Sequence, residues 1–136
     1  MQDSSLKRFV RDPALLSMQI NGDFPRIAAI EEAGDEVVLR LDVTPDLAWF
    51  RGHFPGQPVL PGIIQAHWAA EVASALFNLD GPPRHIKRLK FSNVVVPPRT
   101  VELVLTRHGE REIQFTMRSA DQQHAQGRLV FPEPGQ

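Results

Sequence analysis

The longest apolar segment of the chain, residues 61–79, has the pattern of a buried helix. Apolar side chains occupy most sides of that helix, which is typical of a helix enclosed in a core. Its polar residues fall at positions i, i+4, i+7 and i+11, so they share one face. They are His67, Glu71, Ser74 and Asn78. This pattern alone fits either a solvent-facing side of the helix or a functional surface.

A period of two in the apolar positions predicts strands on both sides of this helix. Residues 36–43 alternate cleanly, and Gly34-Asp35 predicts a hairpin turn from a short strand over residues 26–32. After the helix, strands are expected over residues 84–96, 100–108, 111–119 and 124–131, with a tight turn at Gly109. This order of elements predicts an α+β fold in which an antiparallel sheet wraps around one long central helix.

A chain of 136 residues is expected to form a single domain over residues 1–136. In the polar segment 1–24 we expect a short covering helix that opens at Asp12-Pro13 and ends at Asn21-Gly22. Residues 132–136 are expected to be a loose tail.

Composition narrows the classes of function. A net charge of −1 does not suggest a nucleic-acid partner. The chain has no cysteine, which excludes disulfides and a thiol nucleophile. The longest apolar run is too short and too interrupted to span a membrane. We therefore expect a soluble cytoplasmic protein.

The stretch ahead of the helix, GHFPGQPVLPG at residues 52–62, places a histidine in a stiff Gly- and Pro-rich loop. Pro lacks an N–H and fixes φ near the helical value, so Pro61 suits the first helical position. The N–H groups of a first helical turn have no partner within the helix and carry the positive end of its dipole. Gly62 would let a substrate oxygen that gains negative charge approach them, and the stiff loop would hold His53 in a defined place.

The motif GHFPGQPVLPG resembles the signature of the bacterial 3-hydroxyacyl-[acyl-carrier-protein] dehydratases, which have the hotdog fold. The run IKRLKFSNVVVPP at residues 86–98 is similar to a strand of that family that ends in V-x-P. The resemblance extends from about residue 41 to the C-terminus. Residues 65–69 also look similar to dehydratases encoded with aryl-polyene-type polyketide pathways.

The resemblance implies a role for each matching residue. His53 would be the general base that removes the α-proton of a 3-hydroxyacyl thioester, and the backbone carbonyl of Val59 would orient its ring. The backbone N–H of Gly62 would bind the thioester carbonyl, as the position of this residue at the helix start also suggests. We assign Phe54 and Ile63, which adjoin these residues, to substrate binding.

The chain departs from the family at the general acid, a Glu or Asp fourteen residues after the catalytic His. That position is His67 here, and the Gln usual one turn later is Glu71. An imidazolium is a good proton donor, whereas a neutral imidazole is a poor one. Our hypothesis is that Glu71 keeps His67 protonated and that His67 is the donor. Two alternatives stay open: Glu71 is the direct acid and His67 positions it, or the site binds acyl chains without catalysis.

A metal site is an alternative use of the same residues. His53, His67 and Glu71 include the H-x3-E spacing that zinc ligands can have on a helix. The resemblance argues against a metal, and we expect no cofactor other than the phosphopantetheine that carries the substrate. The other histidines, His85, His108 and His124, lie in predicted strands or turns without ligand spacing and are expected on the surface.

The resemblance also implies partners. Hotdog dehydratases work as dimers, so each active site would take His53 from one subunit and the helix residue from the other. We expect a homodimer, and a heterodimer stays open. A basic cluster around the strand after the helix would receive an acidic acyl carrier protein, or it is simply a solvated sheet edge. The cluster consists of Arg84, Lys87, Arg88, Lys90 and Arg99.

Three hypotheses of function follow. The first is a lyase that dehydrates 3-hydroxyacyl carriers to trans-2-enoyl thioesters in fatty acid, polyketide or aryl polyene biosynthesis. The second is an acyl thioesterase, because the same fold hosts both activities. The third is a non-catalytic subunit that binds acyl carriers or completes the site of a partner.

Overall fold

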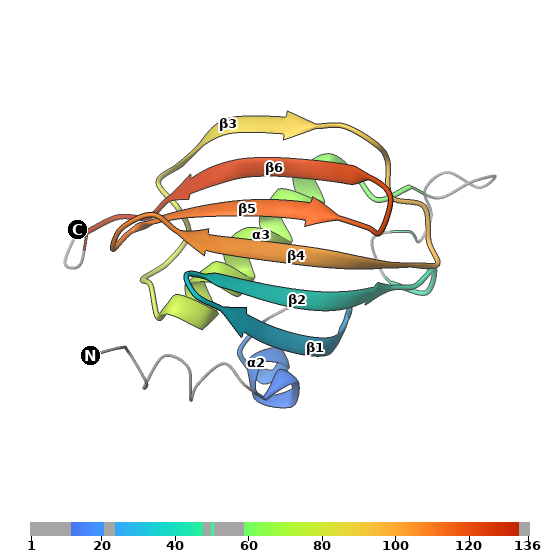
Figure 1. Cartoon of the computed structure of the whole chain (residues 1–136), viewed down its shortest axis with the longest axis horizontal. Coiled ribbons are helices and arrows are strands. Elements are labelled where there is room, and N and C mark those ends of the chain that lie inside the picture. Colours follow the sequence, from blue (N-terminus) through green and yellow to red (C-terminus); the bar gives the residue numbers. More distant parts are fainter. Residues whose placement is uncertain (1–11, 21–23, 48–49, 51–58, 134–136) are drawn as a thin grey trace.

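The computed structural model describes residues 12–20, 24–47, 50 and 59–133. This part of the chain forms two helices and six strands. They are α2 (Pro13–Gln19), β1 (Arg26–Ala33), β2 (Glu36–Val43), α3 (Gly62–Phe77), β3 (His85–Phe91), β4 (Arg99–Arg107), β5 (Glu112–Arg118) and β6 (Gln123–Val130). The strands form one antiparallel sheet in the order β1-β2-β4-β5-β6-β3, and α3 crosses one face of it (Figure 1). The α+β architecture with one central helix and an antiparallel sheet is confirmed.

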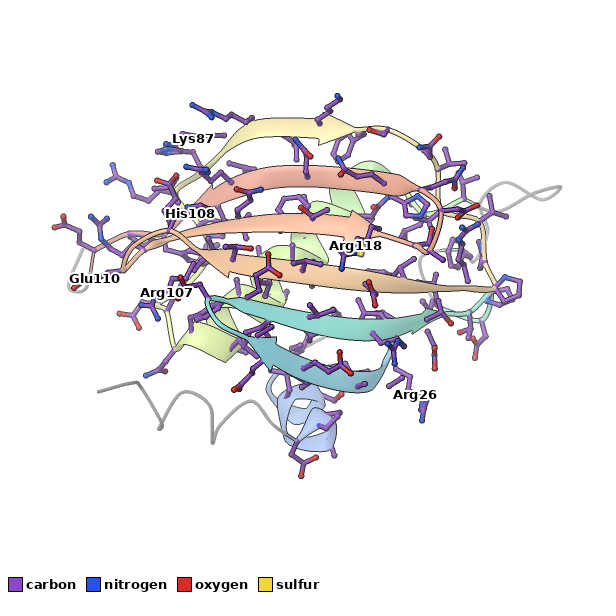
Figure 2. The ribbon with its side chains drawn as sticks, in the orientation of Figure 1. Arg26, Lys87, Arg107, His108, Glu110 and Arg118 are labelled. Carbon is purple, nitrogen blue, oxygen red and sulfur yellow. The ribbon has the colours of Figure 1, made fainter. Side chains whose placement is uncertain are left out.

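The sheet has an apolar face toward α3 and a polar face on the other side. The predicted alternation is confirmed, because the inward residues of the central strands are almost fully buried. They include Leu39, Leu41, Val101, Leu103, Leu105, Ile113, Phe115 and Met117. Ion pairs between strands lie on the opposite face, where Arg118 and Lys87 are visible in Figure 2. A hydrogen bond from Arg128, together with the charge of Lys87, holds the pKa of Glu112 on this face below its ordinary value.

Helix α3 is the core helix that the sequence predicts, shorter by a residue at the start and two at the end. Pro61 is the residue before the first turn, with ψ of 144°, rather than the first helical residue. The helix ends at Asn78, whose φ of 56° is left-handed, a conformation that Asn tolerates better than most residues. The Ser74 hydroxyl donates to the carbonyl of Leu79 over 2.9 Å, which closes the chain turn after the helix.

Helix α2 covers the lower edge of the sheet beside β1 (Figure 1). Asp12 caps its start by accepting from the Ala14 N–H at 2.9 Å. Its Leu16 is fully buried in the core, so the predicted covering helix is confirmed. The predicted end signal Asn21-Gly22 lies outside the described residues. No helix in the described part of the chain has the length and apolar character needed to cross a bilayer.

The prediction of a strand over residues 84–96 is too long at its C-terminal end. Strand β3 ends at Phe91, and its ladder with β6 is already irregular between Lys87 and Lys90, around Arg88 with φ of 54°. Backbone hydrogen bonds to β6 continue as far as Asn93, and two residues later Val95 pairs instead with Leu60 in an isolated bridge. Pro97 and Pro98 have no N–H to donate, which prevents further strand pairing there.

The expectation that His124 lies on the surface is wrong. Its side chain is 1% exposed, and both ring nitrogens have partners: the Ser119 hydroxyl at 2.6 Å and the Asn93 carbonyl at 2.8 Å. Burial of an imidazole is tolerable when both nitrogens are hydrogen-bonded, and a single sequence shows no such partners. His85 and His108 are exposed, as expected.

Candidate functional site

The start of α3 is attached to the chain segment that follows β3. The Leu60 N–H donates to the Val95 carbonyl at 2.8 Å, and both residues are buried. Beyond it, the Pro61 carbonyl accepts from the N–H groups of Ile64 and Gln65, at 3.1 and 3.3 Å. The N–H groups of Gly62 and Ile63 precede these bonds and have no acceptor within the helix. The first turn therefore offers two polarised donors, as the sequence predicts.

Phe91, the last residue of β3, packs directly on Gly62. A β-carbon at position 62 would lie 2.7 Å from the Cδ1 atom of the Phe91 ring, which is too close for any side chain. A side chain at this position would therefore require the Phe91 ring to shift. Phe91 remains 46% exposed and forms an apolar wall next to the helix start.

A groove with a volume of about 810 Å³ runs along one side of α3. One wall is the helix face that carries His67 and Glu71, and the far wall includes Pro82, Pro83 and Ile86. Ser74 and Asn78 line the same groove, so the polar stripe predicted from the spacing is confirmed as one surface. Ile63, at the mouth near Gly62, is 60% exposed. The groove combines apolar walls with polar groups along one line.

The predicted site residues are described in part. His53 and Phe54 lie outside the described residues. Gly62, Ile63, His67 and Glu71 lie on successive turns of α3, and Val59 is half-buried just before the Leu60 bridge. His67 is exposed and Glu71 half-buried.

A metal centre gains no support from the described residues. No three His, Asp or Glu side chains gather there in a way that could hold an ion. The zinc alternative involves His53, which lies outside the described part of the chain.

The sequence did not point to the residues that support the helix start from the sheet. Phe91 and Val95 belong to an apolar run that looks like a continuous strand, and Ile86 to the same run. Their separate roles depend on where β3 ends, which the alternation pattern does not reveal. The signal in the sequence is the Ser92-Asn93 pair, since such residues are common in turns.

The comparison with protein families identifies the chain. Residues 29–128 match the family model for ApeI-like proteins, described as ApeI dehydratase. The chain belongs to the ApeI-like dehydratase family. The match includes the helix start, the groove and the full set of sheet strands from β2 to β5.

Curated relatives of this ApeI-like chain include two 3-hydroxyacyl-[acyl-carrier-protein] dehydratases named FabZ. The FabZ of Latilactobacillus sakei is 38% identical over 82 residues, which are 55% of this chain and 59% of that protein. The FabZ of Rhizobium johnstonii is 32% identical over 90 residues, 60% of this chain and 58% of that protein. The chain spans somewhat under three-fifths of the length of these relatives.

Solved structures of dehydratases are also similar to this chain. The dehydratase heterocomplex ApeI:P from Xenorhabdus doucetiae matches with a TM-score of 0.69 and 31% identity, over 78% of this chain and 96% of that chain. A dehydratase domain of a mycocerosic acid synthase-like polyketide synthase matches with a TM-score of 0.63 over 79% of this chain and 39% of that chain. At 18% identity, the second match shows the fold alone.

The contact between Gly62 and Phe91 predicts a specific coupling. Gly62→Ala should lower the free energy of unfolding by about 1–3 kcal/mol, because the new methyl group forces the Phe91 ring to move. In a Phe91→Leu background the same change should cost less, with a coupling of at least about 0.5 kcal/mol. Urea unfolding of the wild type, both single variants and the double variant measures this. Strictly additive effects would show that the ring does not restrict position 62.

Proposed function

We propose that the chain is a 3-hydroxyacyl-[acyl-carrier-protein] dehydratase, a hydro-lyase acting in fatty acid or polyketide biosynthesis. It would convert a carrier-bound 3-hydroxyacyl thioester to the trans-2-enoyl thioester and water. The observation that carries the proposal is the arrangement on α3. The helix begins at Gly62, whose N–H has no acceptor within the helix, and Ile63, His67 and Glu71 line one groove beside it.

The chemistry requires three functions. The base takes the α-proton, and the electron pair moves toward the thioester carbonyl, whose oxygen gains negative charge. The Gly62 N–H at the positive end of the helix dipole would stabilise that oxygen. When the C–O bond at the β-carbon breaks, an acid must protonate the departing hydroxyl so that it leaves as water. His53, in the GHFP motif, would be the base.

The acid would come from the pair His67 and Glu71. Both lie on the groove, one turn apart, which is the spacing at which helix side chains can meet. The proposed pairing would bring the His67 ring and the Glu71 carboxylate into contact. A carboxylate in contact with the ring would keep the imidazole charged and able to donate.

The active site would lie between two subunits. Strand β3 is at the end of the sheet, and within the described residues no strand pairs with its outer edge. Leu89 and Phe91 on this strand are 38% and 46% exposed, and Ile63 on α3 is more exposed still. A second subunit would cover this apolar border and close the groove, because such surfaces mark protein interfaces.

A second candidate is a subunit that completes the site of a different partner. Two observations favour it. His67 stands where the dehydratases that the GHFP motif resembles have a carboxylic acid. A similar chain belongs to the dehydratase heterocomplex ApeI:P of Xenorhabdus doucetiae. A thioesterase is the third candidate, and it is separated from the others by its product.

Mass spectrometry of the carrier-bound product tests the proposed reaction. Purified protein with a short 3-hydroxyacyl carrier protein should yield the enoyl thioester by loss of one water. His53→Ala should abolish the reaction, and His67→Ala or Glu71→Gln should slow it by roughly 10²-fold or more, because each removes a proton-transfer group. His108→Ala, at the exposed β4–β5 hairpin (Figure 2), is the matched control and should retain full activity.

The other outcomes of this assay separate the candidates. A free acid in place of the enoyl thioester indicates a thioesterase. An inert wild type that gains activity when mixed with a homologue carrying a carboxylic acid at the position of His67 indicates a completing subunit. A wild type that is inert under both conditions refutes the proposal.

An acidic carrier protein would dock on the basic residues of β3. Arg88 and Lys90 are exposed there, whereas Lys87 and Arg99 already pair with Glu112 and Asp121. Raising the ionic strength should increase KM for the carrier-borne substrate, because salt screens this attraction. A small pantetheine thioester should show little change, and an equal response of both substrates would argue against the basic surface.

The oligomeric state tests the shared site. The wild type should sediment as a dimer at micromolar concentration, whereas Leu89→Lys should shift it toward the monomer by placing a charge in the apolar border. Thr116→Lys, on the polar face of β5, should leave the dimer intact. A wild-type monomer with full dehydratase activity would show that one chain builds the site alone.

A further inference from the structure

His124 is a buried histidine for which the proposed reaction has no use. It lies at the start of β6, and its two ring nitrogens contact two different chain segments. Nδ1 is 2.8 Å from the backbone carbonyl of Asn93, which can only accept, so Nδ1 carries the proton. Nε2 is 2.6 Å from the Ser119 hydroxyl in the turn between β5 and β6. The side chain therefore joins the β5–β6 turn to the segment after β3.

The segment after β3 is held to β6 mainly at this point. The Ser92 N–H donates to the His124 carbonyl at 2.9 Å, and the side-chain amide of Asn93 donates to the Gln123 carbonyl at 3.0 Å. Together with the hydrogen bond from the His124 ring to the Asn93 carbonyl, these contacts hold Asn93 through both its side chain and its backbone. The Asn93 carbonyl is part-buried in this contact, and loss of the ring N–H would remove its partner there and so favour movement of the segment.

Two residues further on, the same segment holds the start of α3. The Val95 carbonyl accepts from the Leu60 N–H at 2.8 Å, and Val95 is fully buried. Gly62 follows Leu60 by two residues, across Pro61 with its restricted backbone. The position of Asn93 is thereby transmitted over a few covalent bonds and one hydrogen bond to Gly62.

We propose that His124 is a positioning residue for the thioester-binding start of α3. It fixes the Asn93 carbonyl, which sets Val95 and through it the backbone of Leu60 and Gly62. The proposal deepens the dehydratase function and rests on it. Its expected effect is on the rate of the chemical step, because a donor that is displaced from the developing oxyanion loses its stabilising effect there.

The alternative is that His124 only stabilises the β5–β6 turn through Ser119. The two roles can be separated, because each uses a different ring nitrogen. Asparagine places an amide nitrogen where histidine has Nδ1, and glutamine reaches as far as Nε2. His124→Asn therefore keeps the contact to the Asn93 carbonyl, whereas His124→Gln keeps the contact to Ser119. Ser119→Ala removes the turn contact and leaves the histidine in place.

Steady-state kinetics of the three variants on the carrier-bound substrate tests the proposal. His124→Gln should lower kcat by about tenfold to a hundredfold with little change in KM. His124→Asn and Ser119→Ala should retain most of the wild-type kcat, although each also loses one buried hydrogen bond. Equal losses in His124→Asn and His124→Gln, in proportion to lost thermal stability, would assign the residue a structural role and overturn the proposal.

Amide hydrogen exchange gives a readout that needs no catalytic activity. The Leu60 N–H should exchange about tenfold faster in His124→Gln than in the wild type, and should be unaffected in Ser119→Ala. If the wild type shows no turnover but Leu60 responds in this way, the dehydratase function fails and the positioning link stands. An unchanged Leu60 amide in a folded His124→Gln variant overturns the link.

A milder variant covers the case in which His124→Gln does not fold. Asn93→Ala removes only the exposed amide contact to the Gln123 carbonyl and leaves the buried ring in place. It loosens the same segment, so Leu60 exchange should rise by a smaller factor. Unchanged exchange in this variant would show that the segment does not control the helix start.

Discussion

The backbone hydrogen bond from the Leu60 N–H to the Val95 carbonyl joins the start of the core helix to the end of the sheet. Neither neighbouring segment can extend this contact into a ladder, since Pro61 and Pro97 have no N–H. The bridge therefore stays isolated, with both residues buried. The helix begins directly after this bridge, and its first N–H groups have no acceptor within the helix.

This constraint explains why a core helix can serve a binding site. Most of α3 is enclosed by the sheet, and its own side chains Trp68, Val72 and Leu76 are buried in the core and hold the helix in place. The remaining face lines the groove, where small residues such as Ala66 and Ala70 leave room beside His67 and Glu71. Functional groups on such a helix are held by the core rather than by a loop, and precise placement is what proton transfer needs.

The regular elements could be predicted from the sequence because burial imposes a period. Leu39 and Leu103 pair across β2 and β4 on the inner face, as the alternation requires. The polar stripe on α3 was predictable for the same reason. The end of β3 and the burial of His124 were not, because both depend on partners distant in sequence: Leu60 for Val95, and Ser119 and Asn93 for the imidazole. The pattern of apolar positions in the sequence would be almost the same if these groups had other hydrogen-bond partners.

The exposure of the groove bears on how the site would work. His67 is exposed, Glu71 is half-buried and Ile63 is 60% exposed, so in the isolated chain water reaches the proposed acid side. Water weakens the attraction between a carboxylate and an imidazolium, and a site that excludes it strengthens the same attraction several-fold. A subunit that covers the apolar border would therefore do more than close the groove. It would bring His67 and Glu71 into an environment where ion pairing is favourable, so assembly and activation of the acid would be the same event.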